Sequence, residues 1–106
     1  MSYYFNKSSK SMDIELARLD SEVRTNKWIP ASQVLEIMEN KWKGMKSTWE
    51  LLIDHQEIDN IDLSVSKMKE YVKGKDRVNA LAEISSLKLL FEHIPKKDSL
   101  SLTNIL

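Results

Sequence analysis

Apolar residues recur at spacings of three and four along most of this chain, which is the pattern of amphipathic α-helices. The clearest stripe alternates these two spacings without a miss: Trp28, Ala31, Leu35, Met38, Trp42, Met45, Trp49 and Leu52. Similar stripes cover residues 12–23 and 58–72, and a fourth, more apolar than the others, covers residues 78–94. The chain has only two Gly and two Pro in 106 residues, so long helices are the natural expectation.

The boundaries between the stripes predict where helices begin and end. Gln56 stands where the second stripe would continue, so we expect the helix axis to break or kink near residue 54, with the second and third segments forming either two helices or one kinked helix. Gly74 is predicted to end the third segment as a left-handed C-cap, and Asp76 is predicted to cap the start of the fourth. Pro95 is predicted to end the fourth helix, because proline cannot continue the helical hydrogen bonds.

Short connections at residues 25–27 and 74–76 predict two antiparallel helical hairpins. The expected fold is therefore all-α: a small antiparallel bundle of about four helices, with the apolar tail of residues 96–106 packed back on it. Residues 11–106 are expected to form this single domain, and residues 1–10 a separate N-terminal segment. A tetratricopeptide-like hairpin is the main rival, but its consensus of about 34 residues is not evident.

The first stripe is expected to extend into the N-terminal segment. Phe5 lies seven residues before Met12 and in phase with it, so the first helix can begin before residue 12. Charged residues are predicted mostly to cover the opposite, exposed face of this helix: Asp13, Glu15, Arg18, Asp20, Glu22 and Arg24.

All three tryptophans of the chain, Trp28, Trp42 and Trp49, lie on the second stripe. A row of aromatic side chains can form a ligand groove, but large aromatic residues more commonly dominate a buried core. We therefore interpret this stripe as a core seam that faces the centre of the bundle.

Charge and composition exclude several classes of function. The 16 basic and 16 acidic residues balance, so a nucleic-acid partner, which needs a basic face, is not expected. Without cysteine, the chain has no disulfide, thiolate metal site or cysteine nucleophile. No apolar run approaches the roughly 20 residues of a membrane span. No phosphate loop, Gly-x-Ser-x-Gly or His-Glu-x-x-His motif occurs, so we expect neither an enzyme nor a cofactor.

Residues 54–62, DHQEIDNID, form the densest cluster of candidate ligands in the chain, with one histidine and four carboxylates. If a helix starts here, Asp54 is its N-cap and Glu57 its third residue, which together make a capping-box pattern. Ile53 and Ile58 then occupy the positions of a hydrophobic staple. Most of the acidity therefore has a structural explanation as a helix start.

Capping does not explain His55. His55 precedes the turn at residues 74–76 by about nineteen residues, and His93 follows that turn by about as many. An antiparallel hairpin should therefore bring both histidines to one end of the bundle. Glu57 and Glu92 are expected to join them in a candidate polar cluster. Imidazole and carboxylate groups can ligate zinc, and imidazole titrates near neutral pH. A metal- or proton-responsive site at His55 and His93 is therefore the alternative function.

Two other interpretations remain, one for His93 and one for the carboxylates of residues 54–59. His93 can simply stabilise the last turn of the fourth helix through the helix dipole. A hydrolase using Asp54, Glu57 or Asp59 is a less favoured possibility, because it would need a concave pocket at this point. No metal is assigned, and His55 and His93 stay weak candidates as ligands.

Several segments resemble the bacterial domain-of-unknown-function family 4363. The similarity is carried by Trp49, by residues 52–62 with His55, Glu57, Ile58 and Asp59, by Glu92-His93-Ile94-Pro95, and by the terminal Asn104-Ile105-Leu106. Trp28 and Trp42 also fall where this family places tryptophan. The resemblance covers roughly residues 12–106.

The resemblance implies a class of protein and no reaction, because the family has no established activity. Its members are typically small proteins with one N-terminal membrane helix and a helical domain outside the cytoplasm. The start YYFNKSSKSM is then expected to be the juxtamembrane end of an anchor that this chain lacks. We therefore expect a non-enzymatic protein-interaction module on the outer face of a bacterial membrane. Its protein partner, which can itself be a membrane protein, and its oligomeric state are left open.

Overall fold

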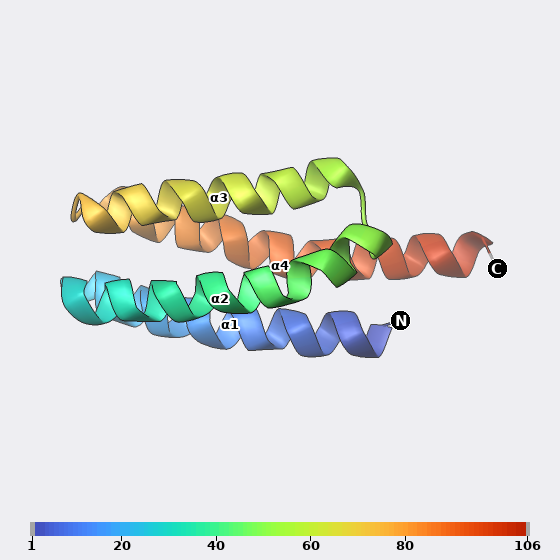
Figure 1. The fold of residues 1–106 in the computed structure, drawn as a ribbon, viewed down its shortest axis with the longest axis horizontal. Helices are drawn as coiled ribbons and strands as arrows, with labels where there is room; N and C mark the ends of the chain where they lie inside the picture. The colour runs from blue at the N-terminus through green and yellow to red at the C-terminus, as the bar shows by residue number, and fades with distance from the viewer. Residues whose placement is uncertain (1, 106) are drawn as a thin grey trace.

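The computed structural model describes the backbone of residues 2–105 and the side chains of residues 3–94. Over this range the chain forms four helices: α1 (Ser2–Arg24), α2 (Trp28–Leu52), α3 (His55–Lys73) and α4 (Arg77–Ile105). Each helix runs antiparallel to the next, and the packed pairs are α1–α2, α2–α3, α3–α4 and α1–α4 (Figure 1). The prediction of an all-α bundle of about four helices is confirmed.

The predicted apolar stripes meet in one shared core. Fully buried side chains come from all four helices and include Phe5, Leu16, Met38, Trp49, Ile61, Met68, Leu87 and Phe91. Val78, which we placed on the fourth stripe, is 73% exposed. It lies two residues before buried Ala80 and therefore on nearly the opposite side of the helix.

Residues 2–10 are part of the first helix of the bundle. Helix α1 runs without a break from Ser2, and the side chain of Phe5 is only 1% exposed within the core. Ser8 and Ser9 are also buried. The expected boundary between residues 1–10 and the bundle therefore does not appear in the helix, whereas the early start suggested by the phase of Phe5 is confirmed.

One charged residue of α1 is not on the exposed face where we placed it. The side chain of Glu15 is 3% exposed, and it accepts hydrogen bonds from Lys41 Nζ of α2 at 2.6 Å and from an Arg18 guanidinium nitrogen at 3.4 Å. Burying an ion is costly unless it is paired and hydrogen-bonded. The ammonium group from the neighbouring helix makes burial of Glu15 possible.

Helix α3 ends in a Schellman motif whose left-handed residue is Lys75 and not Gly74. Gly74 has a φ of −84°, whereas Lys75 has a φ of 55°. The N–H of Lys75 donates to the Val72 carbonyl oxygen at 3.1 Å, and the N–H of Asp76 donates to the Tyr71 carbonyl oxygen at 2.8 Å. The prediction for Gly74 is wrong by one position, because the helical turn continues through the glycine.

The two aspartates predicted as N-caps behave differently. Asp76 Oδ1 accepts a hydrogen bond from the backbone N–H of Asn79 at 3.2 Å, so this cap is confirmed. Asp54 occupies the N-cap position of α3, and its carbonyl oxygen accepts the N–H groups of Glu57 and Ile58 at 3.0 and 3.3 Å. Its carboxylate, however, makes no capping hydrogen bond. The Asp54 side chain is exposed, so water can satisfy it instead.

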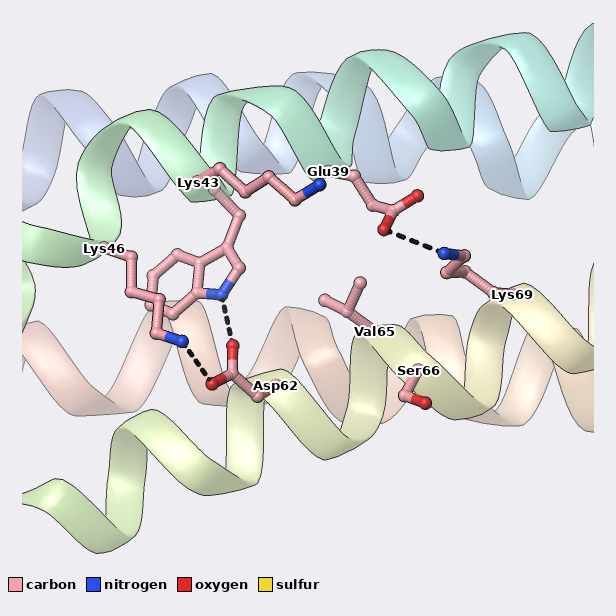
Figure 2. Close-up of a pocket in the computed structure, with 8 residues that line it drawn as sticks. Glu39, Lys43, Lys46, Asp62, Val65, Ser66 and Lys69 are labelled. Carbon is pink, nitrogen blue, oxygen red and sulfur yellow. Dashed lines mark hydrogen bonds and ion pairs between the residues drawn. The ribbon is translucent and has the colours of Figure 1, made fainter.

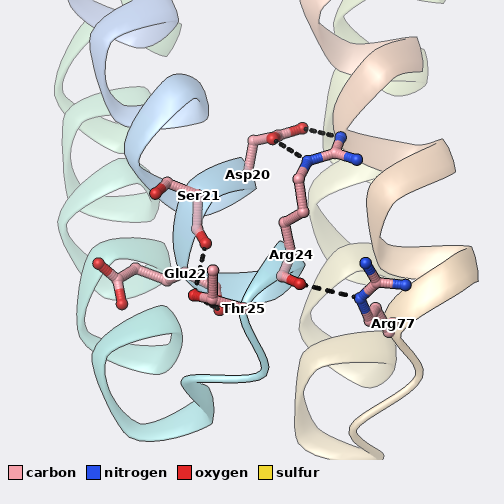
Figure 3. A network of polar contacts seen from close by, with 6 residues as sticks. All are labelled: Asp20, Ser21, Glu22, Arg24, Thr25 and Arg77. Carbon is pink, nitrogen blue, oxygen red and sulfur yellow. Dashed lines mark hydrogen bonds and ion pairs between the residues drawn. The ribbon is translucent and has the colours of Figure 1, made fainter.

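The two hairpin turns are tied together at one end of the bundle (Figure 3). Helix α1 also ends on a left-handed residue, Asn26, with a φ of 58°. Arg77 Nε at the start of α4 donates to the Arg24 carbonyl oxygen at 3.0 Å, and the Arg24 guanidinium donates to Asp20 at 3.0 Å. The opposite end holds the N-terminus and the extended link at Ile53 between α2 and α3 (Figure 1).

Helix α4 does not end at Pro95. Its backbone is helical to Ile105, and its C-terminal end reaches beyond the ends of the other helices (Figure 1). The prediction that Pro95 ends the fourth helix is therefore wrong, because a proline inside a helix costs one hydrogen bond and crowds the preceding turn but does not always end the helix. The apolar tail side chains, Leu100, Leu102, Ile105 and Leu106, lie outside the side chains that are described. None of the described helices combines the length and apolarity that crossing a membrane requires.

The left-handed turn at Lys75 gives a stability prediction. We expect Lys75→Gly to raise the free energy of unfolding by about 0.5–1 kcal/mol, because glycine adopts a positive φ without a Cβ clash. Urea unfolding followed by circular dichroism measures this change. Gly74→Ala is the matched control and should bring no gain, since a Cβ there would lie 3.3 Å from the Glu70 carbonyl oxygen. A Lys75→Gly variant less stable than the wild type would contradict the prediction.

Candidate functional site

The two histidines of the predicted polar cluster are both exposed. The side chain of His55 is 88% exposed, and its Nε2 atom lies 3.7 Å from Asp59 Oδ2 on the same helix. His93 on α4 is exposed as well, and Glu57 is half-buried in the first turn of α3. Among the described residues, no group of three His, Asp or Glu side chains lies close enough together to hold a metal ion.

Glu92, the fourth residue of that predicted cluster, lies close enough to Asp13 of α1 to affect its pKa. Burial chiefly, and then the negative charge of Glu92, raise the pKa of Asp13 above its ordinary value of 3.8, while the charge of Lys88 opposes this rise. Asp13 Oδ1 is buried and has no hydrogen-bond partner among the side chains described. The contact between α1 and α4 therefore contains a carboxylate that is costly to ionise.

The raised pKa of Asp13 predicts a pH dependence of stability. Because the folded state holds this proton more tightly than the unfolded state, the contribution is fully present below the ordinary carboxyl pKa and is lost as pH rises through the raised pKa. We expect Asp13→Asn to abolish this loss and to raise the melting temperature at neutral pH. Thermal unfolding between pH 3 and pH 7 measures the effect. An Asp13→Asn curve parallel to that of the wild type would contradict it.

The acidic stretch supplies one residue to a well-defined contact between helices, and that residue is Asp62. Its Oδ1 atom accepts a hydrogen bond from Trp42 Nε1 at 2.8 Å, and its Oδ2 atom lies 2.7 Å from Lys46 Nζ (Figure 2). Burial alone would raise the pKa of Asp62, but the hydrogen bonds from Lys46 and Trp42 and the charge of Lys46 together lower it. Asp62 is therefore held as a carboxylate between two donors from α2.

Sequence reasoning assigned no role to Asp62, although one signal was available. A buried tryptophan usually needs an acceptor for its indole N–H, and Trp42 is 3% exposed. The acceptor has to come from a neighbouring helix, and Asp62 lies beside buried Ile61 at the edge of the α3 stripe. Only the relative rotation of α2 and α3 identifies it as the partner.

The tryptophan stripe lies in the core. The ring of Trp49 packs edge-on against Phe5, Trp42 and Phe91, with centroid distances of 5.0, 5.7 and 5.4 Å. Trp28 is partly buried at the margin of the same core. These rings join α1, α2 and α4, and Trp49 is fully buried among them, whereas Trp42 also reaches the lining of a pocket.

A pocket opens between α2 and α3 around the Asp62 contact (Figure 2). We call it the α2–α3 pocket; its volume is about 220 Å³, and its lining residues are Glu39, Trp42, Lys43, Lys46, Asp62, Val65, Ser66 and Lys69. Lys69 Nζ lies 3.3 Å from Glu39 Oε2 across the pocket. A wider hollow of about 500 Å³ shares Glu39 and Lys69 and continues along the two helices to Ser32 and Lys73.

An apolar groove lies on the other side of α3. Its volume is about 370 Å³, and we call it the α3–α4 groove; it is lined by Asn60, Leu63, Ser64, Lys67, Glu83, Ser86, Leu89 and Leu90. Leu63 is 59% exposed and Leu89 is 52% exposed, whereas Leu90 is partly buried against the core. At the rim, Ser64 Oγ donates to Glu83 Oε2 at 2.6 Å and Lys67 Nζ lies 3.4 Å from Glu83 Oε1.

The structure thus defines a small antiparallel four-helix bundle with a hollow on each side of α3. Residues 1–105 match the family model described as "Domain of unknown function (DUF4363)". The chain therefore belongs to this family, as the sequence resemblance predicted. No curated protein and no solved structure gave a match.

Proposed function

We propose that this protein is a non-enzymatic module that binds another protein through the α3–α4 groove. The observation that carries this proposal is the exposure of two large apolar side chains, Leu63 at 59% and Leu89 at 52%, on the two sides of one groove. Leu90 adds a third apolar side chain to the lining, and the other lining residues are polar. An exposed apolar centre with a polar rim is typical of surfaces that bind proteins.

The occupant that fits this groove is an amphipathic helix with acidic residues beside its apolar face. The groove runs between two antiparallel helices, and such a groove accepts a third helix along its length. The Lys67 side chain at the rim is 49% exposed, whereas that of its partner Glu83 is only 12% exposed. The accessible charge beside the leucines is therefore positive and would favour a negative flank on the partner.

We also propose that the module faces outward from a bacterial membrane and is held by an anchor that precedes α1. The support is the composition of the surface at the start of α1. Tyr3 is 76% exposed, Tyr4 is 36% exposed, and Lys7 Nζ lies 5.9 Å from the centroid of the Tyr3 ring. Tyrosine and lysine together are typical of the membrane–water interface.

The location can be tested in cells that express the complete reading frame with a C-terminal epitope tag. We expect the tagged protein in the membrane fraction, with the tag removed by protease added to protoplasts. Recovery in the cytosolic fraction, or a tag protected from external protease, would refute the proposed location. Neither result would bear on the proposed binding through the α3–α4 groove.

Protein binding can be tested with a photo-crosslinking amino acid placed at position 63 in the organism that encodes the protein. We expect one discrete crosslinked product from position 63 and none from position 29, where Ile29 is 76% exposed on α2. Leu89→Asp in the same protein should remove the product. Equal products from the two positions, or a product that survives Leu89→Asp, would refute the groove.

The crosslinked protein can then be purified and its affinity measured directly. Leu63→Asp should weaken binding by about tenfold or more, because an apolar side chain at the centre of an interface carries much of the binding energy. Ile29→Asp is the control for a general effect of surface charge and should leave the affinity unchanged.

A further inference from the structure

The α2–α3 pocket contains three ammonium groups but only two carboxylates. Lys46 Nζ is paired with Asp62 at 2.7 Å, and Lys69 Nζ is paired with Glu39 at 3.3 Å. The second oxygen of Asp62 is occupied by the indole N–H of Trp42. Both carboxylates of the pocket are therefore already engaged by other donors.

Lys43 is the third ammonium group of the pocket, and it is exposed. Among the described residues it has no ion pair within 4.0 Å and no hydrogen bond, although Lys46 and Lys69 in the same pocket each have one partner. Its side chain extends along α2 toward Glu39 (Figure 2). The pocket lining therefore contains one ammonium group, that of Lys43, which no described side chain pairs with directly.

We propose that this pocket binds a carboxylate group at Lys43, supplied by an aspartate or glutamate of the protein partner. The charge count decides between anions: one surplus ammonium matches a monovalent carboxylate, whereas a phosphate dianion would leave a second charge uncompensated beside Glu39 and Asp62. The inference rests on the proposed function in one respect, namely that the carboxylate belongs to a protein.

The position of α3 connects this pocket to the α3–α4 groove. Asp62, Ser66 and Lys69 line the pocket on one side of the helix, and Leu63 and Lys67 line the groove on the other. A partner that lies across α3 can therefore place an apolar side chain in the groove and an acidic side chain in the pocket at once. The partner segment is then expected to carry an apolar side chain that enters the groove on one side of α3 and an acidic side chain that enters the pocket on the other side.

The pocket can be tested without the natural partner, by titrating the ¹⁵N-labelled full chain with a short glutamate-rich peptide. The indole N–H of Trp42 reports directly, because it donates to Asp62 in the pocket wall; Trp42→Phe identifies its signal. We expect a saturable shift of this signal, with the affinity weakened by about tenfold in Lys43→Gln. Sodium chloride at equal ionic strength should give no saturable shift.

Lys10→Gln is the matched control, because Lys10 is an exposed lysine on α1, outside the pocket lining. It should bind the peptide like the wild type, and the melting temperature of each variant shows that both are folded. Peptide binding that is unchanged in Lys43→Gln, or equally weakened in Lys10→Gln, would overturn the inference. Tighter binding of inorganic phosphate than of the peptide would overturn the assignment to a carboxylate. Each outcome is independent of the Leu63 and Leu89 variants, which test the groove.

Discussion

Replacing Trp49 by alanine is expected to lower the free energy of unfolding by about 3–5 kcal/mol, the largest effect of any single substitution proposed for this protein. Trp49 has 0% exposure, and its ring packs edge-on against Phe5, Trp42 and Phe91 from three helices. Its Nε1 atom also donates to Ser8 Oγ at 3.0 Å. Truncation would leave a cavity that rigid helices can close only in part. Urea unfolding followed by far-ultraviolet circular dichroism measures the loss.

Trp49→Phe separates the packing of the ring from its hydrogen bond. It retains an aromatic ring but removes the indole donor, so it should cost clearly less than Trp49→Ala. Leu51→Ala is a control on the same helix, because Leu51 is 85% exposed and an exposed apolar residue contributes little to the core. A loss below about 1 kcal/mol for Trp49→Ala would show that this residue does not lie at the centre of the core.

Replacing Asp62 by alanine is expected to cost about 1–3 kcal/mol, chiefly because the buried indole N–H of Trp42 loses its acceptor. Lys46 loses its partner at the same time. That loss should add little, because the side chains of Lys46 and Asp62 are both more than one third exposed, at 35% and 38%, and exposed ion pairs contribute little to stability. The free energy of unfolding of the two single variants, Asp62→Ala and Trp42→Phe, and of the double variant measures the coupling between them. Additive effects would contradict the assigned hydrogen bond.

The same residue predicts how stability varies with acid. The pKa of Asp62 is lowered in the folded state, so its contribution is present above the ordinary carboxyl pKa and is lost as the pH falls through the lowered value. The stability difference between the wild type and Asp62→Asn should therefore be constant above about pH 5 and shrink below about pH 4. This trend is opposite to that of Asp13, whose pKa is raised. A difference that grows on acidification would contradict the contact.

Much of the fold could be predicted from the sequence because helix periodicity is a local property. The spacing from Trp28 to Leu52 locates α2, and the change of phase at Gln56 locates the break before α3. The errors arose where local signals compete. Gly74 is the residue type that favours a left-handed cap, but the left-handed position is one residue later, at Lys75. Pro95 interrupts hydrogen bonding in α4 without ending the helix.

The candidate site was less predictable, because it depends on how each helix is rotated toward its neighbours. His55 and His93 lie at matching distances from the turn at residues 74–76, yet both are exposed, and His55 lies beside Asp59 of its own helix. Equal distance from a turn fixes the level of a residue along the bundle, but it does not fix the direction of its side chain. Leu63 and Leu89 also fall outside the buried stripes, so only the paired helices bring them to one groove.

By itself, the sequence determined the helical class, the four segments, the composition of the core and membership of the family, because these follow from short-range spacing and residue identity. The tertiary structure alone decided which charged groups face other helices. Glu15 is buried because Lys41 reaches it from α2, and Asp62 is held because Trp42 and Lys46 lie opposite it. It also decided that Lys43 forms no ion pair with a described side chain. These outcomes depend on contacts between residues 16 to 26 positions apart, and no local pattern in the chain encodes such contacts.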